Sequence, residues 1–244
     1  MSGNRPLKTH GWTQGLYQVS STIKEVIGQK RETDDGRIFR YAKAGAAALA
    51  AGKLGIAANI AAEHLNQAIL AAVAAGEYCL TLVVTAGTAI AENALRGGQF
   101  QINDAVGEGS IYGIESNSAI SASGTEIVIT LTDPIKVALT TASEFTLAHN
   151  PWNGVVESTT LGKACGVPLV AVPESNFYWA QTGGLGIGLI DGTPAVGSLL
   201  QQSNATAGAM EIYAAETIVF KPVAEIFGTA GISTEYKPVV YCID

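Results

Sequence analysis

Residues that commonly carry chemistry are scarce in this chain of 244 residues, which has 3 cysteines, 3 histidines and 14 Lys or Arg residues. The odd cysteine count and the lack of a CxxC pair argue against a disulfide framework and a zinc knuckle. Because Cys79 and Cys242 lie in apolar, strand-like runs, we expect buried structural thiols in a reducing compartment. No histidine lies at metal-ligand spacing from another histidine or a cysteine, so we expect no metal site and no cofactor. His10, His64 and His149 are expected to have polar surface or interface roles.

Positive charge is also limited, and the formal net charge is −7. This acidic balance argues against broad nucleic-acid binding, which needs a basic face that displaces counterions from phosphates. It also argues against a polybasic membrane anchor. The most apolar region, residues 42–76, is broken by polar residues and lacks the roughly 20 consecutive apolar residues that span a bilayer. Residues 1–15 lack an apolar core, so we expect neither a signal peptide nor a membrane span.

Sequence motifs that would indicate catalysis are missing as well. The glycine run at residues 183–188 lacks GxGxxG spacing, and a strand-like stretch follows it rather than a helix. We interpret this run as a glycine-rich strand that another backbone approaches closely. The acidic pairs Asp34 with Asp35 and Asp104 with Glu108 lie beside glycines and are typical of turns. The sequence therefore predicts a protein without catalytic residues.

Short apolar or alternating runs, separated by turns rich in Gly, Asp and Asn, make up most of the chain after residue 77. This pattern predicts a mainly β protein built from β-barrel or β-sandwich units. We expect strands at residues 78–84, 99–102, 109–114, 126–131, 155–156, 165–172, 176–181, 186–190, 210–213, 226–231 and 239–243. The predicted segments are an N-terminal arm and hairpin (1–59), a first β unit (60–149) and a second, barrel-like β unit (150–244).

The first part of the chain combines an arm with a turn signal. Residues 1–22 are polar with scattered aromatics and no clear period, so we interpret them as an extended arm. The sequence Asp34-Asp35-Gly36 lies between two strand-like runs, 23–28 and 37–42. Because glycine accepts a positive φ without penalty, this arrangement predicts a tight hairpin.

The Ala-rich stretch that follows the hairpin is ambiguous. Alanine favours a helix, but Gly45, Gly52 and Gly55 each cost about 1 kcal/mol relative to alanine inside a helix. We therefore expect an irregular linker up to about residue 59. A short helix is the expectation for residues 63–75.

Two ordered segments resemble those of known virion proteins. The segment DGRIFRYAKAGA at residues 35–46 resembles a pattern of structural proteins that are encoded beside major capsid genes in tailed phages. The segments FYWAQTGG at residues 177–184 and IDGTPAVG at 190–197 resemble the core of β-barrel capsid decoration proteins. Together these segments make the chain similar to the tailed-phage capsid decoration or cement family of head auxiliary proteins over most of residues 30–215.

The resemblance implies a non-enzymatic virion structural protein on the capsid surface, made in the cytoplasm of the bacterial host. Such a protein would decorate or cement the shell by bridging major capsid protein subunits, and it would associate with itself as a dimer or trimer. Neither a membrane nor a nucleic acid is expected as a partner. A tail, baseplate or head-fibre module is an alternative, since it would suit the β content equally well. An enzyme or ligand binder with a β-barrel pocket is a further alternative.

Basic and aromatic residues concentrate near the beginning of this acidic chain, because residues 24–53 hold 7 of its 14 Lys and Arg residues. We therefore predict a contact surface with the capsid or with another subunit in this region. Tyr178 is added because aromatics are enriched at interfaces, although the run 177–179 is itself typical of a buried strand. The predicted interface residues are Trp12, Tyr17, Arg31, Arg37, Phe39, Arg40, Tyr41, Lys43 and Tyr178. The alternative is a solvated hairpin with ordinary turn charges.

Overall fold

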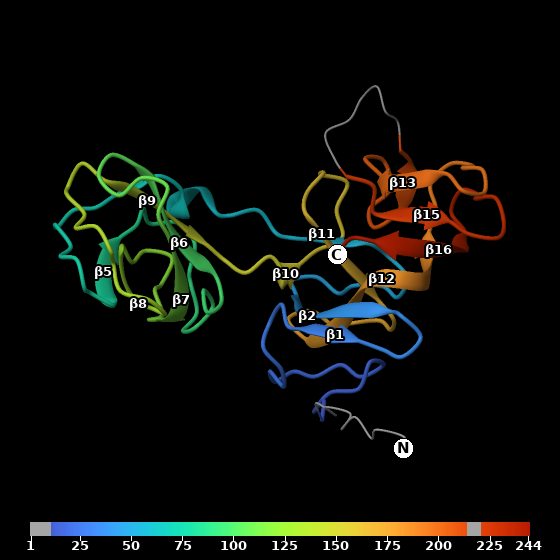
Figure 1. Cartoon of the computed structure of the whole chain (residues 1–244), viewed down its shortest axis with the longest axis horizontal. Coiled ribbons are helices and arrows are strands. Elements are labelled where there is room, and N and C mark those ends of the chain that lie inside the picture. The colour runs from blue at the N-terminus through green and yellow to red at the C-terminus, as the bar shows by residue number, and fades with distance from the viewer. Residues whose placement is uncertain (1–10, 214–220) are drawn as a thin grey trace, which may run out of the picture. The chain divides into compact units, whose positions relative to one another are not determined.

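The chain folds into two compact units in the computed structural model, which describes residues 11–213 and 221–244. Unit 2 is the central segment Ile56–Val155, and unit 1 combines the chain on both sides of it. Strands make up 40% of the structure and helix 1%, so the mainly β fold predicted from the sequence is confirmed (Figure 1). Residues 1–59 and 150–244 were predicted to be separate segments, whereas the described chain up to Gly55 belongs to the same unit as the C-terminal part.

The strands of unit 1 come from both ends of the chain. They are β1 (Lys30–Glu32), β2 (Ile38–Ala44), β11 (Ala164–Pro168), β12 (Phe177–Leu189), β13 (Leu199–Gln202), β14 (Met210–Ile212), β15 (Ala224–Ile226) and β16 (Tyr236–Cys242). The elements of unit 2 are the 3-10 helix η1 (Ala62–His64), β4 (Gln67–Ala68), β5 (Cys79–Val83), β6 (Gln99–Asp104), β7 (Ile111–Asn117), β8 (Glu126–Leu131) and β9 (Glu144–Ala148). The short strands β3 (Gly55–Ile56) and β10 (Asn153–Val155) lie where the chain passes from one unit to the other.

Strand β12, with 13 residues, organises unit 1. The strand order is β1-β2-β12-β16-β15-β13-β14, and these neighbours pair antiparallel (Figure 1). Ile190, directly after β12, forms a parallel bridge with Met210 of β14, so the sheet curls back on itself into a barrel. Apolar side chains from these strands, among them Leu200, Met210 and Tyr241, fill its interior.

The two halves of β12 have different partners because their side chains differ. The aromatic first half pairs with β2, and Phe177 and Trp179 pack there with Phe39 and Tyr41. The glycine-rich second half pairs with β16. A Cβ on Gly186 would lie 2.6 Å from the Tyr241 ring, and one on Gly184 would lie 2.8 Å from the carbonyl oxygen of Gly36. The interpretation of residues 183–188 as a strand under close backbone approach is therefore confirmed.

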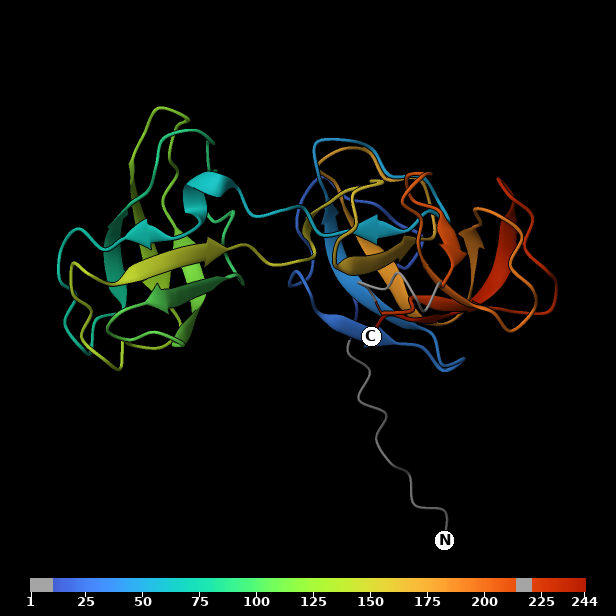
Figure 2. The same cartoon turned by 90° about the horizontal axis from the view of Figure 1, so that it is seen from above.

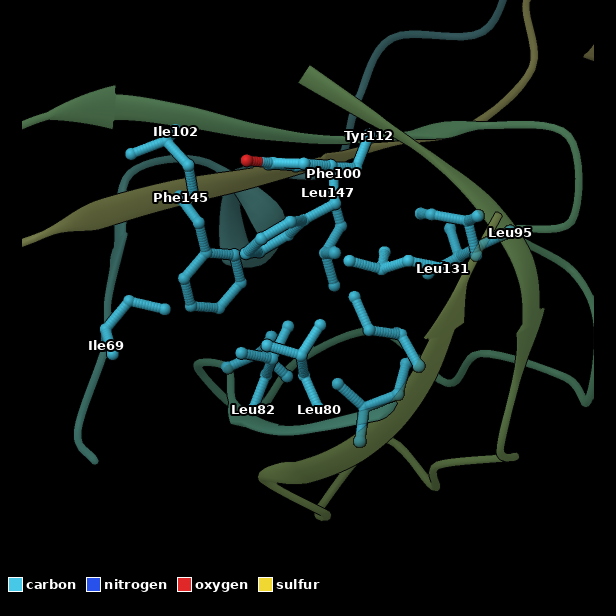
Figure 3. Packing of buried hydrophobic residues seen from close by; sticks show 14 of the residues in the cluster. Ile69, Leu80, Leu82, Leu95, Phe100, Ile102, Tyr112, Leu131, Phe145 and Leu147 are labelled. Carbon is cyan, nitrogen blue, oxygen red and sulfur yellow. The ribbon is translucent and has the colours of Figure 1, made fainter. Parts of the chain in front are cut away.

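Unit 2 is a nearly closed, barrel-like sheet, drawn in cyan to yellow-green in Figure 2. Its strand order is β4-β9-β6-β7-β8-β5. The Oε1 atom of Gln67 in β4 accepts hydrogen bonds from the N–H and the hydroxyl of Thr85, which follows β5, both at 2.9 Å. The interior is apolar, and side chains from facing strands meet there, including Phe100, Phe145 and Leu80 (Figure 3). Unit 2 therefore has a hydrophobic core of its own.

The predicted hairpin is confirmed, although its first strand begins later than expected. Strands β1 and β2 pair antiparallel around the Asp34-Asp35-Gly36 turn, in which Gly36 has a φ of +80°. The first strand is Lys30–Glu32 rather than residues 23–28. Residues 11–22 contain no strand, but Ser20 and Phe177 exchange two backbone hydrogen bonds of 3.0 and 2.8 Å. The described part of the predicted arm thus lies against β12.

The expected helix at residues 63–75 is wrong apart from one turn. The structure has only the 3-10 turn Ala62–His64 there, and β4 begins at Gln67. Leu65 is extended, and Asn66 has a φ of 48°, which no α-helix accommodates. Pairing of β4 with β9 therefore overrides the helix propensity of the alanines.

Candidate interaction surface

Gln14 fastens the N-terminal segment to the sheet of unit 1. Its side chain is 2% exposed, and its Nε2 donates to the carbonyl oxygen of Phe177 at 3.0 Å. The Tyr41 hydroxyl donates to its Oε1 at 2.6 Å, while its backbone carbonyl accepts from the Trp179 indole at 3.0 Å. Buried hydrogen bonds of this kind are costly to break, because an unpaired buried polar group costs about 1–3 kcal/mol. We call this arrangement the Gln14 clasp.

Arg31 closes the clasp from the outside. Its guanidinium lies 5.3 Å from the ring centroid of Trp12 and 5.5 Å from that of Trp179, and it donates to the backbone carbonyl of Gln14 at 3.1 Å. The two indole rings meet edge to face at 5.0 Å. Burial lowers the pKa of Arg31 from its ordinary value. Trp12 and Arg31 are therefore engaged within the chain, where the cation–π contacts help to hold the segment down.

The cations of the β1–β2 hairpin also have partners inside unit 1. Arg40 forms a bidentate pair with Asp244, with nitrogen–oxygen distances of 2.6 and 2.9 Å, and its hydrogen bond lowers the pKa of that carboxyl group. Arg37 pairs with Asp35 at 2.7 Å. The Lys43 ammonium lies 5.6 Å from the ring centroid of Phe177. Two of the hairpin cations, Arg37 and Arg40, are thus neutralised by carboxylates of the chain itself.

The structure separates the predicted interface residues into two groups. Phe39, Tyr41 and Tyr178 are 0%, 0% and 1% exposed, so they lie in the core of the unit and not at the surface where the sequence analysis expected them. The Tyr178 hydroxyl is buried without a hydrogen-bond partner among the described residues, and burial raises its pKa. The others remain accessible. Tyr17 is 64% exposed, and partial exposure is seen for Trp12, Arg31, Arg37, Arg40 and Lys43.

A different surface of unit 1 is apolar and uncovered. Strand pairing places Leu185 opposite Val240, and Val240 opposite Glu225. Glu225 in turn lies opposite Leu199, so one row crosses four strands. Residues directly opposite in antiparallel strands share a face of the sheet. Leu185, Leu199 and Val240 are 52%, 44% and 38% exposed, which shows that this face points outward.

A second row continues the same face. Ile187 lies two residues beyond Leu185 and opposite Pro238, and it is 52% exposed. Phe227 donates its N–H to the Pro238 carbonyl at 3.0 Å and is 52% exposed. We call this surface the apolar sheet face. Its members are Leu185, Ile187, Leu199, Phe227, Tyr236, Pro238 and Val240, and within these described rows Glu225 is the single charged residue. Contiguous exposed apolar surface of this kind typically marks a contact site.

Strands were predicted from the sequence for β12 and β16, but β13 and the apolar sheet face were missed. The signal was present, because β16 has apolar residues at both parities: Val239 and Tyr241 are buried, whereas Pro238 and Val240 are exposed. A strand with apolar side chains on both faces is typical of a sheet that is packed against other structure on both faces. In the described part of unit 1, only the inner face of β16 is packed against other side chains, and its outer face is exposed.

The cysteines and histidines depart from expectation. Cys79 and Cys242 are exposed free thiols, so the prediction of burial is wrong for both; burial holds for Cys165, whose pKa it raises to about 12. His64 is 7% exposed rather than at the surface, and its Nε2 has no hydrogen-bond partner in the described chain. His149 is half-buried in unit 2, which also contains His64. His10 lies outside the described residues.

Over residues 11–213 and 221–244, no group of three or more His, Cys, Asp or Glu is placed to hold a metal ion.

Comparisons with known proteins add no assignment. No protein-family model, no curated protein and no solved structure matches the chain. No helix within the described ranges is long and apolar enough to cross a membrane.

Proposed function

We propose that the chain is a virion structural protein of a tailed phage that binds the outer surface of the capsid shell and bridges major capsid subunits. The observation that carries the proposal is the apolar sheet face on unit 1, since an exposed apolar contact surface suits a protein that works by attachment. The resemblance of residues 35–46 and 177–197 to phage head proteins supports the same role.

The energy available from one apolar patch of typical size favours attachment to an assembled shell over binding to one free subunit. An exposed apolar patch of roughly 400 Å² would contribute about 10 kcal/mol when buried. Association itself costs roughly 4–15 kcal/mol. One face against one free subunit is therefore marginal. On a shell, a first contact raises the effective concentration of every further contact, so bridging several subunits gives stable attachment.

The charge distribution supports a protein partner. Arg37 and Arg40 of the hairpin form ion pairs within unit 1, Lys43 lies over the Phe177 ring, and the chain carries a net charge of −7. A surface of this kind does not provide the row of basic groups that binding to phosphates requires. Self-association as a dimer or trimer stays a prediction, and so does the absence of enzymatic activity.

The test is co-sedimentation of the purified chain with capsids that lack it. Leu185→Asp places a charge on the apolar sheet face, at the β12 end of its first row, and should abolish co-sedimentation. Ile111→Asp is the matched control, because Ile111 is 53% exposed on β7 of unit 2 and its replacement should leave binding unchanged. Binding of Leu185→Asp at the wild-type level would refute the proposal. Immunogold labelling at the tail of intact virions would instead support a tail, baseplate or fibre module.

A further inference from the structure

A cavity of about 590 Å³ opens in unit 1 at the end of β16, and its lining includes Cys242, two residues beyond Val240 of the apolar sheet face. Its walls are Gly162, Lys163, Ala164, Gln202, Lys221, Pro222, Val223, Cys242 and Ile243. The volume lies within the range of pockets that hold small organic ligands. Apolar side chains dominate the lining, so the cavity can take a hydrocarbon or aromatic group.

One wall of the cavity is held in place by a buried amide. Gln202 is 4% exposed, and its Nε2 donates to the carbonyl oxygens of Ser158 and Thr160 at 3.0 and 2.9 Å. Its Oε1 accepts from the N–H of Gly162 at 3.1 Å. Three hydrogen bonds from one side chain fix the loop that carries Gly162 and Lys163. The wall is therefore preorganised, which lowers the entropic cost of binding a ligand.

Two lysines give the cavity its charge preference. The Lys163 ammonium donates to the Ala164 carbonyl at 3.0 Å, which places it at the cavity wall. Lys221 is exposed, also lines the cavity and forms none of the ion pairs found among the described residues. None of the described lining residues is acidic, and two carboxylates act on the lining from outside it: Asp244 on Lys163 and Glu225 on Cys242. In a chain of net charge −7, two ammonium groups at one apolar cavity favour an anionic ligand.

We propose that this cavity binds an organic anion with an apolar body, with the negative group near Lys163 and Lys221 and the apolar body against Val223, Pro222 and Ile243. The anion can come from a free organic acid or from an acidic side chain next to apolar residues in a peptide. This proposal does not depend on the role of the chain at a capsid.

The probe is 8-anilinonaphthalene-1-sulfonate, titrated by fluorescence into the full chain. Lys163→Ala combined with Lys221→Ala should weaken its binding about tenfold, which is the effect of one lost charged hydrogen bond. N-phenyl-1-naphthylamine has the same rings without the sulfonate, and its affinity should stay unchanged. Lys136→Ala, at an exposed position of unit 2, is the matched control. Equal sulfonate affinity in the double variant and the wild type would overturn the proposal, and so would equal weakening of both probes.

Competition identifies the source of the anion. Displacement of the bound sulfonate by decanoate, but not by 1-decanol, supports a free organic acid. Displacement by the blocked peptide N-acetyl-Ile-Val-Glu-amide supports a peptide segment. Failure of both competitors contradicts the proposal.

The exposed thiol of Cys242 gives a second measurement that leaves both lysines in place. In a Cys79→Ser chain, alkylation of Cys242 by N-ethylmaleimide should fill part of the cavity and reduce sulfonate binding. The bound sulfonate should also slow the alkylation, as followed by intact mass. Full sulfonate affinity after complete alkylation of Cys242 would place the bound probe elsewhere and reject the site.

Discussion

Units 1 and 2 have similar apolar interiors but differ in the polarity of their outward-facing strand positions. Each encloses an apolar core between antiparallel strands. On unit 1 the outward positions of β12 and β16 are apolar, with Leu185 opposite Val240. On unit 2 the corresponding positions of β6 carry Gln99, Gln101 and Asn103. Amides at the surface keep a sheet soluble, whereas exposed leucine and valine favour contact with a partner that covers them.

The outward-facing amides of β6, which we call the polar strip of unit 2, form hydrogen bonds within the unit. Asn103 donates from its Nδ2 to the Oδ1 of Asn66 and to the hydroxyl of Thr146, both at 2.7 Å. Gln101 donates to Gln99 at 3.1 Å. Nothing in this strip calls for a partner. This difference agrees with the proposal that unit 1 carries the attachment surface, while this side of unit 2 has a polar surface.

The strongest way to test the separation of the two units is to damage one core. Phe100 is fully buried and packs on Phe145 at a centroid distance of 5.5 Å. Phe100→Ala should destabilise unit 2 by about 3–5 kcal/mol through lost burial and the resulting cavity. Urea unfolding followed by tryptophan fluorescence should then show an earlier transition for unit 2 and an unchanged transition for unit 1. Phe39→Ala should do the reverse. Equal shifts of both transitions would show one cooperative structure.

The Gln14 clasp offers a smaller effect that is confined to unit 1. Gln14→Ala should lower the free energy of unfolding of unit 1 by about 2 kcal/mol, because the Tyr41 hydroxyl loses its acceptor. Gln101→Ala is the matched control for loss of an amide side chain, since Gln101 lies on the solvated strip of unit 2. A Gln14→Ala effect no larger than that of the control would show that the clasp contributes nothing.

The buried histidines of unit 2 should make the stability of this unit depend on pH. Burial lowers the pKa of His64 more than the neighbouring Glu63 raises it. Burial also lowers the pKa of His149. The charge of His64 lowers it further, whereas a hydrogen bond with the Ala58 backbone raises it. The unfolded chain therefore binds protons first, so unit 2 loses stability as the pH falls below the ordinary histidine pKa of about 6.5. His64→Asn should reduce this loss in urea unfolding at pH 7 and pH 5. An identical pH dependence in that variant would exclude His64 as the cause.

Local patterns in the sequence predicted much of the fold. The Asp34-Asp35-Gly36 turn and the alternation at residues 126–131 needed no distant information, and both agree with the structure. The predicted runs 176–181 and 186–190 proved to be one strand, because the glycines between them continue the pairing rather than end it. Strands β9 and β13 were missed, as their short mixed sequences gain their form from neighbours.

The contact surfaces could not be predicted in the same way. The clasp joins Gln14 to Phe177 across 163 positions, and no local pattern encodes such a contact. Aromatic residues near a basic stretch suggested an interface, yet Phe39 and Tyr41 fill a core that only the fold reveals. Likewise, which parity of β16 faces outward depends on the closure of the barrel through Ile190 and Met210.

Oxidative side-chain footprinting of the chain on capsids tests the central claim most directly. Phe227 and Tyr236 of unit 1 are 52% and 42% exposed, and Tyr78 of unit 2 is 49% exposed, so the free chain should oxidise at all three. On capsid binding, we expect strong protection of Phe227 and Tyr236 and no change at Tyr78. Unchanged oxidation of Phe227 and Tyr236 in the bound state would contradict the assignment of the apolar sheet face as the attachment surface.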